Sequence, residues 1–155
     1  MKANIETLKN ELWNHMMDNV ANDHEQFIAL LYHLTANEGQ QDWEEVDEMI
    51  GNDYLVLTDE EADEKAYEYI ADNVWAFKPS FLSSYTGIDE EVFKVLQENR
   101  NEDANAPITS MIEDFDEFVG DAVRTDGRGH FLASYDFNEY EVTVNDTTYY
   151  IYRVN

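Results

Sequence analysis

Residues 58–77 read TDEEADEKAYEYIADNVWAF, and the rest of the chain is best interpreted outward from this stretch. Thr58 followed by Glu61 is the sequence pattern of a capping box, in which two residues satisfy free N–H groups at a helix N-terminus. Apolar residues then recur at helical spacing. They are Ala62, Ala66, Tyr69, Ile70, Val74 and Phe77. The stretch therefore predicts an amphipathic helix that buries one stripe.

The polar faces of this predicted helix are strongly acidic. Residues 59–72 hold seven carboxylates and Lys65, so six net negative charges lie along ~21 Å of helix, at about 1.5 Å per residue. That is one charge per ~3.5 Å, close to the ~3.4 Å per charge along one strand of B-DNA. A solvated helix face, with acids favoured near its N-terminus, is the simpler interpretation.

The chain as a whole is acidic in the same way. Its 155 residues include 35 acids and 9 bases, which gives a net charge of -26. Residues 1–50, 51–100 and 101–155 contribute -9, -8 and -9, so the excess is spread through the chain and is not an acidic tail. Such a surface repels nucleic acid and anionic membranes and attracts a basic protein partner.

Composition also bounds the class of protein. Apolar residues make up 43% and aromatic residues 14% of the chain, which is enough to build a core despite the charge. A length of 155 residues is typical of one domain. The chain has no cysteine, and no stretch has the pattern of a signal peptide or a membrane span. We expect a single domain over residues 1–155, a cytoplasmic location and no cofactor, with the oligomeric state left open.

Helical periodicity extends over most of the first 126 residues. Residues 5–20 form an amphipathic pattern, followed either by a break near residues 21–22 and a second helix or by one continuous helix. Shorter helices are expected after Asp42, Pro79 and Asp89, which all favour a helix N-terminus.

Three further segments complete the helical part. Pro107 opens a predicted helix whose apolar positions continue to Val123. Residues 54–57 form either a brief strand or an extended lead into the central helix. Residues 99–105 are polar and are expected to form a loop.

The hydrophobic period changes from helical to alternating after residues 126–129. Residues 131–135 alternate with a period of two, which predicts a first strand. Residues 140–144 also alternate, and Asn145-Asp146 can form a two-residue turn into another strand. The expected cross-strand pairs are Val144 with Thr147, Val142 with Tyr149, and Tyr140 with Ile151. We predict an α+β fold, with a helical body over 1–126 and an antiparallel sheet of about three strands within 130–154.

Two patterns that resemble metal sites fail on a required residue. The His-Glu pair at residues 24–25 begins like a zincin motif, but Ile28 stands where the second histidine is needed. Residues 101–112 begin like a calcium loop, but Ala106 and Ile112 occupy the glycine and glutamate positions. The histidines at nine-residue intervals cannot converge on one straight helix. They are His15, His24 and His33. We predict no metal site.

Residues 126–130, DGRGH, form the most distinctive short run. Arg128 could clamp an anion and His130 could act as a general base, which would describe a small enzyme. The structural interpretation is simpler, because Gly127 can end the preceding helix and Gly129 can permit a tight turn into the first strand. No nucleophile at a defined offset accompanies the run, so the enzyme stays an alternative hypothesis.

Four runs resemble sequences of small hypothetical proteins carried by bacteriophages: LTDEEADE, WAFKPSFL, DGRGHFLASYD and YYIYR. This resemblance implies no established activity, cofactor or catalytic residue. In size, isoelectric point and spread of charge, the chain also resembles the acidic DNA-mimic proteins of phages, which include antirestriction and some anti-CRISPR proteins. The second resemblance implies an inhibitor that acts in the cytoplasm of an infected bacterium.

The leading hypothesis is a non-enzymatic inhibitor whose carboxylates replace phosphates in the DNA- or RNA-binding groove of a basic host protein. Restriction enzymes, CRISPR effectors, nucleoid proteins and repair enzymes are candidate targets. The alternatives are a small enzyme centred on Arg128 and His130 and a highly soluble acidic interaction module. On the central helix the expected binding residues are Asp59, Glu60, Asp63, Glu64, Glu68 and Asp72. On the helix over 107–123 they are Glu113, Asp114, Asp116, Glu117 and Asp121.

Overall fold

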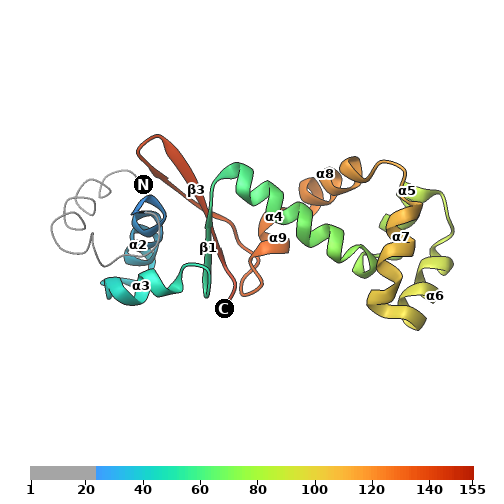
Figure 1. Cartoon of the computed structure of the whole chain (residues 1–155), viewed down its shortest axis with the longest axis horizontal. Coiled ribbons are helices and arrows are strands. Elements are labelled where there is room, and N and C mark those ends of the chain that lie inside the picture. Colours follow the sequence, from blue (N-terminus) through green and yellow to red (C-terminus); the bar gives the residue numbers. More distant parts are fainter. Residues whose placement is uncertain (1–23) are drawn as a thin grey trace. The chain divides into compact units, whose positions relative to one another are not determined.

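The structure, a computed structural model, describes residues 24–155 and has an α+β fold, as predicted (Figure 1). Backbone contacts divide the described residues into two compact units, one formed by residues 24–64 with 128–155 and the other by Lys65–Gly127. We call them unit 1 and unit 2. The helix expected over residues 5–20, and the break after it, lie outside the described residues. The assignment of residues 1–155 to one domain stays a prediction.

Unit 1 contains the antiparallel sheet, whose strand order is β1 (Tyr54–Leu57), β3 (Thr147–Arg153), β2 (Tyr140–Val144). The pairing of β2 with β3 confirms the predicted register, with Val142 opposite Tyr149. Asn145 and Asp146 both have positive φ, at 51° and 44°, as a type I′ hairpin turn requires. The side-chain alternation and the turn chemistry therefore specified this hairpin together.

The prediction of a strand over residues 131–135 is wrong. Phe131 and Leu132 are the last two residues of the short helix α9 (Arg128–Leu132). The third strand of the sheet is β1 instead. Phe131, Leu132 and Ala133 are consecutive and all buried, whereas a strand would have placed Leu132 on the opposite face. An alternating pattern five residues long did not distinguish a half-buried strand from one buried helical turn.

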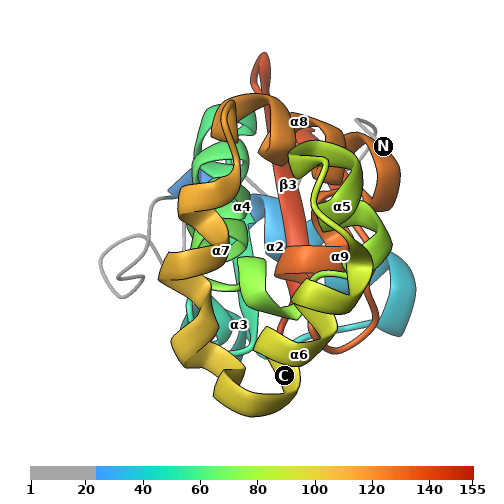
Figure 2. The ribbon, with the colours of Figure 1, turned by 90° about the vertical axis from the view of Figure 1, so that its right-hand side faces the viewer.

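Two layers cover the faces of this sheet (Figures 1 and 2). Helices α2 (His24–Glu38) and α3 (Trp43–Met49) lie on one side, with Asp42 capping α3 as predicted. Helix α9 lies on the other side, in front of β3 in Figure 2. The core between α2, α3 and the sheet contains Phe27, Ile28, Leu31, Leu34, Val46, Val56, Val142, Val144 and Ile151. The alternation in β2 predicts that Tyr140 faces the core beside Val142, but Tyr140 is 38% exposed, so that prediction is wrong.

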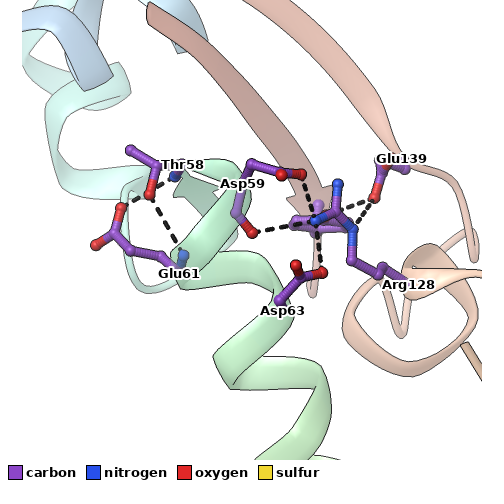
Figure 3. A network of polar contacts seen from close by, with 7 residues as sticks. Thr58, Asp59, Glu61, Asp63, Arg128 and Glu139 are labelled. Carbon is purple, nitrogen blue, oxygen red and sulfur yellow. Dashed lines mark hydrogen bonds and ion pairs between the residues drawn. The ribbon is translucent and has the colours of Figure 1, made fainter. Parts of the chain in front are cut away.

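The central acidic stretch forms α4 (Asp59–Asp72), which begins directly after β1. The capping box is present: Thr58 N donates to Glu61 Oε1 over 3.0 Å, and Glu61 N donates to Thr58 Oγ1 over 3.3 Å (Figure 3). The buried stripe is narrower than expected, since Tyr69 is 47% exposed. Its buried members within the helix are Ala62, Ala66 and Ile70. The short helix η2 (Val74–Ala76) follows after Asn73.

The rest of unit 2 is helical, with α5 (Pro79–Thr86), α6 (Glu90–Arg100), η3 (Asn101–Ala104), α7 (Asn105–Met111) and α8 (Phe115–Asp126). Two predictions need correction. The expected loop over 99–105 is helical, and the helix expected over 107–123 is interrupted between Met111 and Phe115. The rings of Phe77, Phe81 and Phe118 pack together, with centroids 5.1–5.7 Å apart.

One half-buried amide ties residue 105 to another segment of unit 2. The side chain of Asn105 accepts a hydrogen bond from Trp75 N over 3.1 Å and donates to Ala71 O over 2.8 Å. It therefore satisfies backbone groups left free where α4 gives way to η2. The polar sequence of residues 99–105 predicted a solvent-exposed loop. Asn105 instead forms hydrogen bonds with backbone groups of another segment.

Candidate functional site

A row of four carboxylates runs along α4 at every fourth position. Its members, which we call the α4 row, are Glu60, Glu64, Glu68 and Asp72. All four residues are exposed, and among the described residues none has a side-chain hydrogen bond or ion pair. Since α4 is one continuous helix, successive members lie ~6 Å apart along the axis and about 40° around it.

Two other carboxylates of α4 are engaged by Arg128 (Figure 3). Arg128 Nη1 donates to Asp59 Oδ1 over 2.8 Å, to Asp63 Oδ1 over 3.0 Å and to the backbone oxygen of Asp59 over 3.1 Å. The two carboxylates stay about two-thirds exposed, whereas the Arg128 side chain is only 10% exposed. Asp59 and Asp63 were predicted to imitate phosphates, and each already has a cationic partner inside unit 1.

The same guanidinium reaches the loop that follows α9. Arg128 Nε donates to Glu139 Oε2 over 2.9 Å, and Tyr152 Oη donates to the same oxygen over 2.6 Å. The guanidinium also lies 4.5 Å from the centroid of the Tyr150 ring. We call Arg128, Asp59, Asp63, Glu139 and Tyr152 the arginine cluster.

The pKa values of Arg128 and Tyr152 are raised in this cluster. Although burial by itself lowers the pKa of Arg128, hydrogen bonds to Glu139 and Asp59 raise it well above the ordinary value. Burial and the hydrogen bond to Glu139 both raise the pKa of Tyr152. These two side chains therefore keep their protons, which suits a structural ion cluster and not a proton-transfer site.

This geometry leaves little support for the enzyme built on Arg128 and His130. The guanidinium that was to clamp an anion is occupied by carboxylates. The His130 ring is exposed and stacks on Phe137, with centroids 5.8 Å apart and planes 30° apart. Gly127 does end α8, donating to Val123 O over 2.8 Å at φ 85°. The role expected for Gly129, a turn into a strand, is wrong, because Gly129 lies within α9.

The acids expected on the second helix mostly have structural partners within unit 2. Asp114 caps α8 by accepting a hydrogen bond from Glu117 N over 3.1 Å, and Asp116 accepts from Tyr67 Oη over 2.8 Å. Asp121 pairs with Arg124 one turn later. Glu113 lies before α8, and its side chain, like that of Glu117, is exposed. The sequence placed these carboxylates on one long helix, whereas several of them surround its interruption.

Two hollows open on the described surface. One, of about 700 Å³ in unit 2, is lined by Tyr85, Phe115 and four carboxylates, which are Glu113, Asp114, Asp116 and Glu117. The other, of about 130 Å³ in unit 1, is lined by His33, Leu34, Asn37, Glu38, Tyr54, Asp136, Tyr140 and Arg153. Burial lowers the pKa of His33, against the opposing effect of Glu38 and Asp136. Neither hollow joins a nucleophile to a base.

Sequence reasoning missed the arginine cluster almost entirely. Glu139, Tyr150 and Tyr152 looked like ordinary members of a hairpin region, and no spacing rule joins them to Arg128. The available signal was the charge ratio. With nine bases among 35 acids, each arginine is expected to bind more than one carboxylate.

Comparison with known proteins adds no relationship. No family model, no curated protein and no solved structure matches this chain. Over residues 24–155, no helix is long and apolar enough to cross a membrane. Within the same residues, no three histidine, aspartate or glutamate side chains group in a way that could hold a metal ion.

Proposed function

We propose that this protein is a nucleic-acid mimic that occupies the basic DNA- or RNA-binding groove of another protein. The α4 row is the observation that carries the proposal. Carboxylates of the row stand in for phosphates, and the partner's lysines and arginines are their counter-ions. The proposed host setting is the cytoplasm of a phage-infected bacterium, and the proposed targets are defence proteins such as restriction enzymes or CRISPR effectors.

The α4 row is unfavourable for the isolated fold. Like charges four residues apart on a helix destabilise it by roughly 0.2–0.5 kcal/mol per pair, and the row contains three such pairs. A helix selected only for stability would alternate acids with lysines at this spacing. Lys65 is the one base on α4, and it lies outside the row. The repulsion is offset when a basic partner supplies the missing charge.

The geometry of the row resembles a short, right-handed path of charge. Each step of four residues advances ~6 Å and turns about 40° in the sense of the helix. A strand of B-DNA also winds right-handedly, with one charge per ~3.4 Å of axis. The row is sparser than a strand, so it imitates alternate phosphates and not every phosphate.

Contacts within the chain favour some of the acids predicted from sequence over others as the proposed binding surface. Asp59 and Asp63 are held by Arg128, and Asp114, Asp116 and Asp121 have local partners. The α4 row is therefore the stronger candidate, with Glu113 and Glu117 as a second group. The alternative of a merely soluble acidic module predicts that every exposed carboxylate contributes equally.

A charge-matched pair of variants separates these two functions. In the row variant, Glu60→Gln, Glu64→Gln, Glu68→Gln and Asp72→Asn are combined. In the scattered variant, Glu38→Gln, Glu48→Gln, Glu98→Gln and Glu102→Gln change exposed carboxylates on four other segments. Both variants lose four negative charges. Affinity for a purified protein captured from bacterial lysate should fall much further for the row variant, while equal losses would support the soluble module.

A further inference from the structure

Unit 1 has two large aromatic side chains that are mostly exposed. Tyr135 is 59% exposed and Phe137 is 60% exposed, which are the largest exposed fractions of any large apolar residue in the described chain. Both belong to the segment between α9 and β2. The exposed ring of His130 stacks on Phe137. We call His130 and Phe137 the aromatic surface.

The backbone under Phe137 is tightly held. Phe137 N donates to Ala133 O over 2.7 Å, and Asn138 N donates to Asp136 Oδ1 over 3.1 Å. The chain crosses Gly129 so closely that a Cβ on that glycine would lie 2.7 Å from Phe137 O. The exposed ring therefore projects from a rigid support, which limits the entropy lost when a partner covers it.

Phe137 also has an unfavourable backbone conformation. Its φ is 61°, in the left-handed region that glycine or asparagine adopts readily and a bulky residue adopts only with strain. The ring gains one described stacking contact, with His130, and leaves most of its surface in water. The contacts within the described residues thus do not account for phenylalanine at this position.

Charge identifies the chemistry of a partner for this surface. Within unit 1, residues 128–141 hold three carboxylates and one base, Arg128, so the segment that carries the aromatic surface is acidic in sequence. A net charge of -26 disfavours nucleic acid, an anionic membrane and a second copy of the chain as occupants. Aromatic rings among carboxylates suit arginine, whose guanidinium stacks on a ring face and also pairs with carboxylates. Within residues 24–155, arginine lies over an aromatic ring in three places: Arg153 over Tyr135 at 3.8 Å and over Tyr54 at 5.8 Å, and Arg128 over Tyr150 at 4.5 Å.

We propose that the aromatic surface is a docking site for an arginine-containing basic segment of a protein partner, with Phe137 as its anchor. This inference rests on the proposed function for the basic character of the partner. It adds selectivity, because the α4 row attracts any basic groove, whereas a fixed aromatic ring favours a partner that places an arginine over it.

The test uses a defined probe. A fluorescein-labelled peptide of six arginines separated by glycines is titrated with the whole protein by fluorescence anisotropy at ~150 mM salt, where exposed charges are screened beyond ~8 Å. Phe137→Ser should weaken binding about two- to fivefold, the range for exposed cation–π contacts. Phe137→Trp should retain or strengthen binding, because tryptophan is the best cation–π partner. The equivalent lysine peptide should bind less tightly, and its affinity should change less when Phe137 is substituted.

Val95→Ser is the matched control, since Val95 is 53% exposed on α6 in unit 2. It should leave the affinity unchanged. Equal affinities of Phe137→Ser and wild type, an equal loss in Val95→Ser, or no wild-type binding would each overturn the docking site. If Phe137→Ser weakens peptide binding but nucleic acid does not compete with this protein for the captured partner, the docking site is supported and mimicry is rejected. If Phe137→Ser has no effect but nucleic acid does compete for the partner, mimicry is supported and the docking site is rejected.

Discussion

Arg128 and Asp59 are 69 positions apart in the chain, yet Arg128 Nη1 donates to Asp59 Oδ1 over 2.8 Å. The contact joins the start of α9 to the first turn of α4, and Nε of the same guanidinium binds Glu139 before β2. Three segments of unit 1 are thus held by one nearly buried side chain. The cluster assigns a structural role to the residue that had looked most catalytic.

Arg128→Met should destabilise the protein by about 2 kcal/mol, within the range for hydrogen bonds to charged groups. Arg128→Lys should recover only part of this loss, because an ammonium cannot reproduce the separate Nε and Nη1 contacts. Urea unfolding measures both variants. The control is Arg124→Met, whose pair with Asp121 involves an arginine side chain that is 69% exposed and should matter by less than ~1 kcal/mol. Similar midpoints for both methionine variants would contradict the structural role.

Gly129→Ala should be destabilising by about 1–3 kcal/mol, the usual range for overpacking. The added methyl would meet backbone atoms of Phe137 and Asn138 at 2.7 and 2.8 Å, and backbone cannot move aside as a side chain can. Gly120→Ala is the matched control. Its methyl would meet only the end of the Arg124 side chain, at 3.3 Å, so it should stabilise α8 by about 0.5–1 kcal/mol. In thermal unfolding, the melting temperature should fall for Gly129→Ala and rise for Gly120→Ala. A shift in the same direction for both variants would contradict the close approach of residues 137–138 to Gly129.

The hairpin and the helix caps could be predicted because local rules determine them. The turn at Asn145-Asp146 fixes the register, and the Thr58–Glu61 capping box is complete within four residues. Failures occurred where a distant segment decides the local conformation. Residues 128–132 become helical where the chain at residues 137–139 crosses Gly129, a contact that no local pattern reveals.

The sequence predicted which carboxylates could form the candidate site, but it did not predict the contacts that these carboxylates make. The sequence analysis treated Asp59 and Asp63 like the members of the α4 row, and it could not show that both carboxylates share Arg128. Pairing across 69 positions depends on the tertiary fold. The α4 row, by contrast, follows from helical geometry once the helix is known.

Tyr149→Asp should destabilise the fold by about 3 kcal/mol or more, because it buries a carboxylate among apolar side chains. Tyr149 is 7% exposed, and its hydroxyl donates to Glu25 Oε1 over 2.9 Å, so the new charge would also face Glu25. Tyr140→Asp lies on the same sheet face but at a 38% exposed position, and it should cost far less. Equal losses in urea unfolding would show that Tyr140 is a core residue after all.

His33 should make the stability of the protein fall at mildly acidic pH. Burial lowers its pKa in the folded state below the ordinary value near 6.5, so the unfolded chain takes up the proton first. The free energy of unfolding should therefore decline as pH falls below ~6.5 and continue to decline until the folded state is protonated. His33→Gln removes this component. The difference between wild-type and variant stability, measured from pH 8 to pH 5, should narrow or reverse as pH falls, whereas parallel curves would exclude His33 as the cause.

The α4 row should be dispensable for folding. Converting Glu60, Glu64, Glu68 and Asp72 to amides removes three repulsive pairs, so the free energy of unfolding should rise by about 1 kcal/mol or stay level. Glu64→Gln alone should change partner affinity by at most ~1 kcal/mol, because single exposed charges contribute little. A row variant that unfolds would make the carboxylates part of the fold and remove the reason for assigning them to a partner.

Competition with nucleic acid tests mimicry most directly. The wild-type protein is titrated against its purified captured partner with and without duplex DNA or RNA, at low and at high salt. Mimicry predicts that nucleic acid and this protein exclude each other, that affinity falls steeply as salt rises, and that the row variant loses several times more affinity than the scattered variant. A partner that binds this protein and its nucleic acid at the same time, with little dependence on salt, would contradict the proposed function.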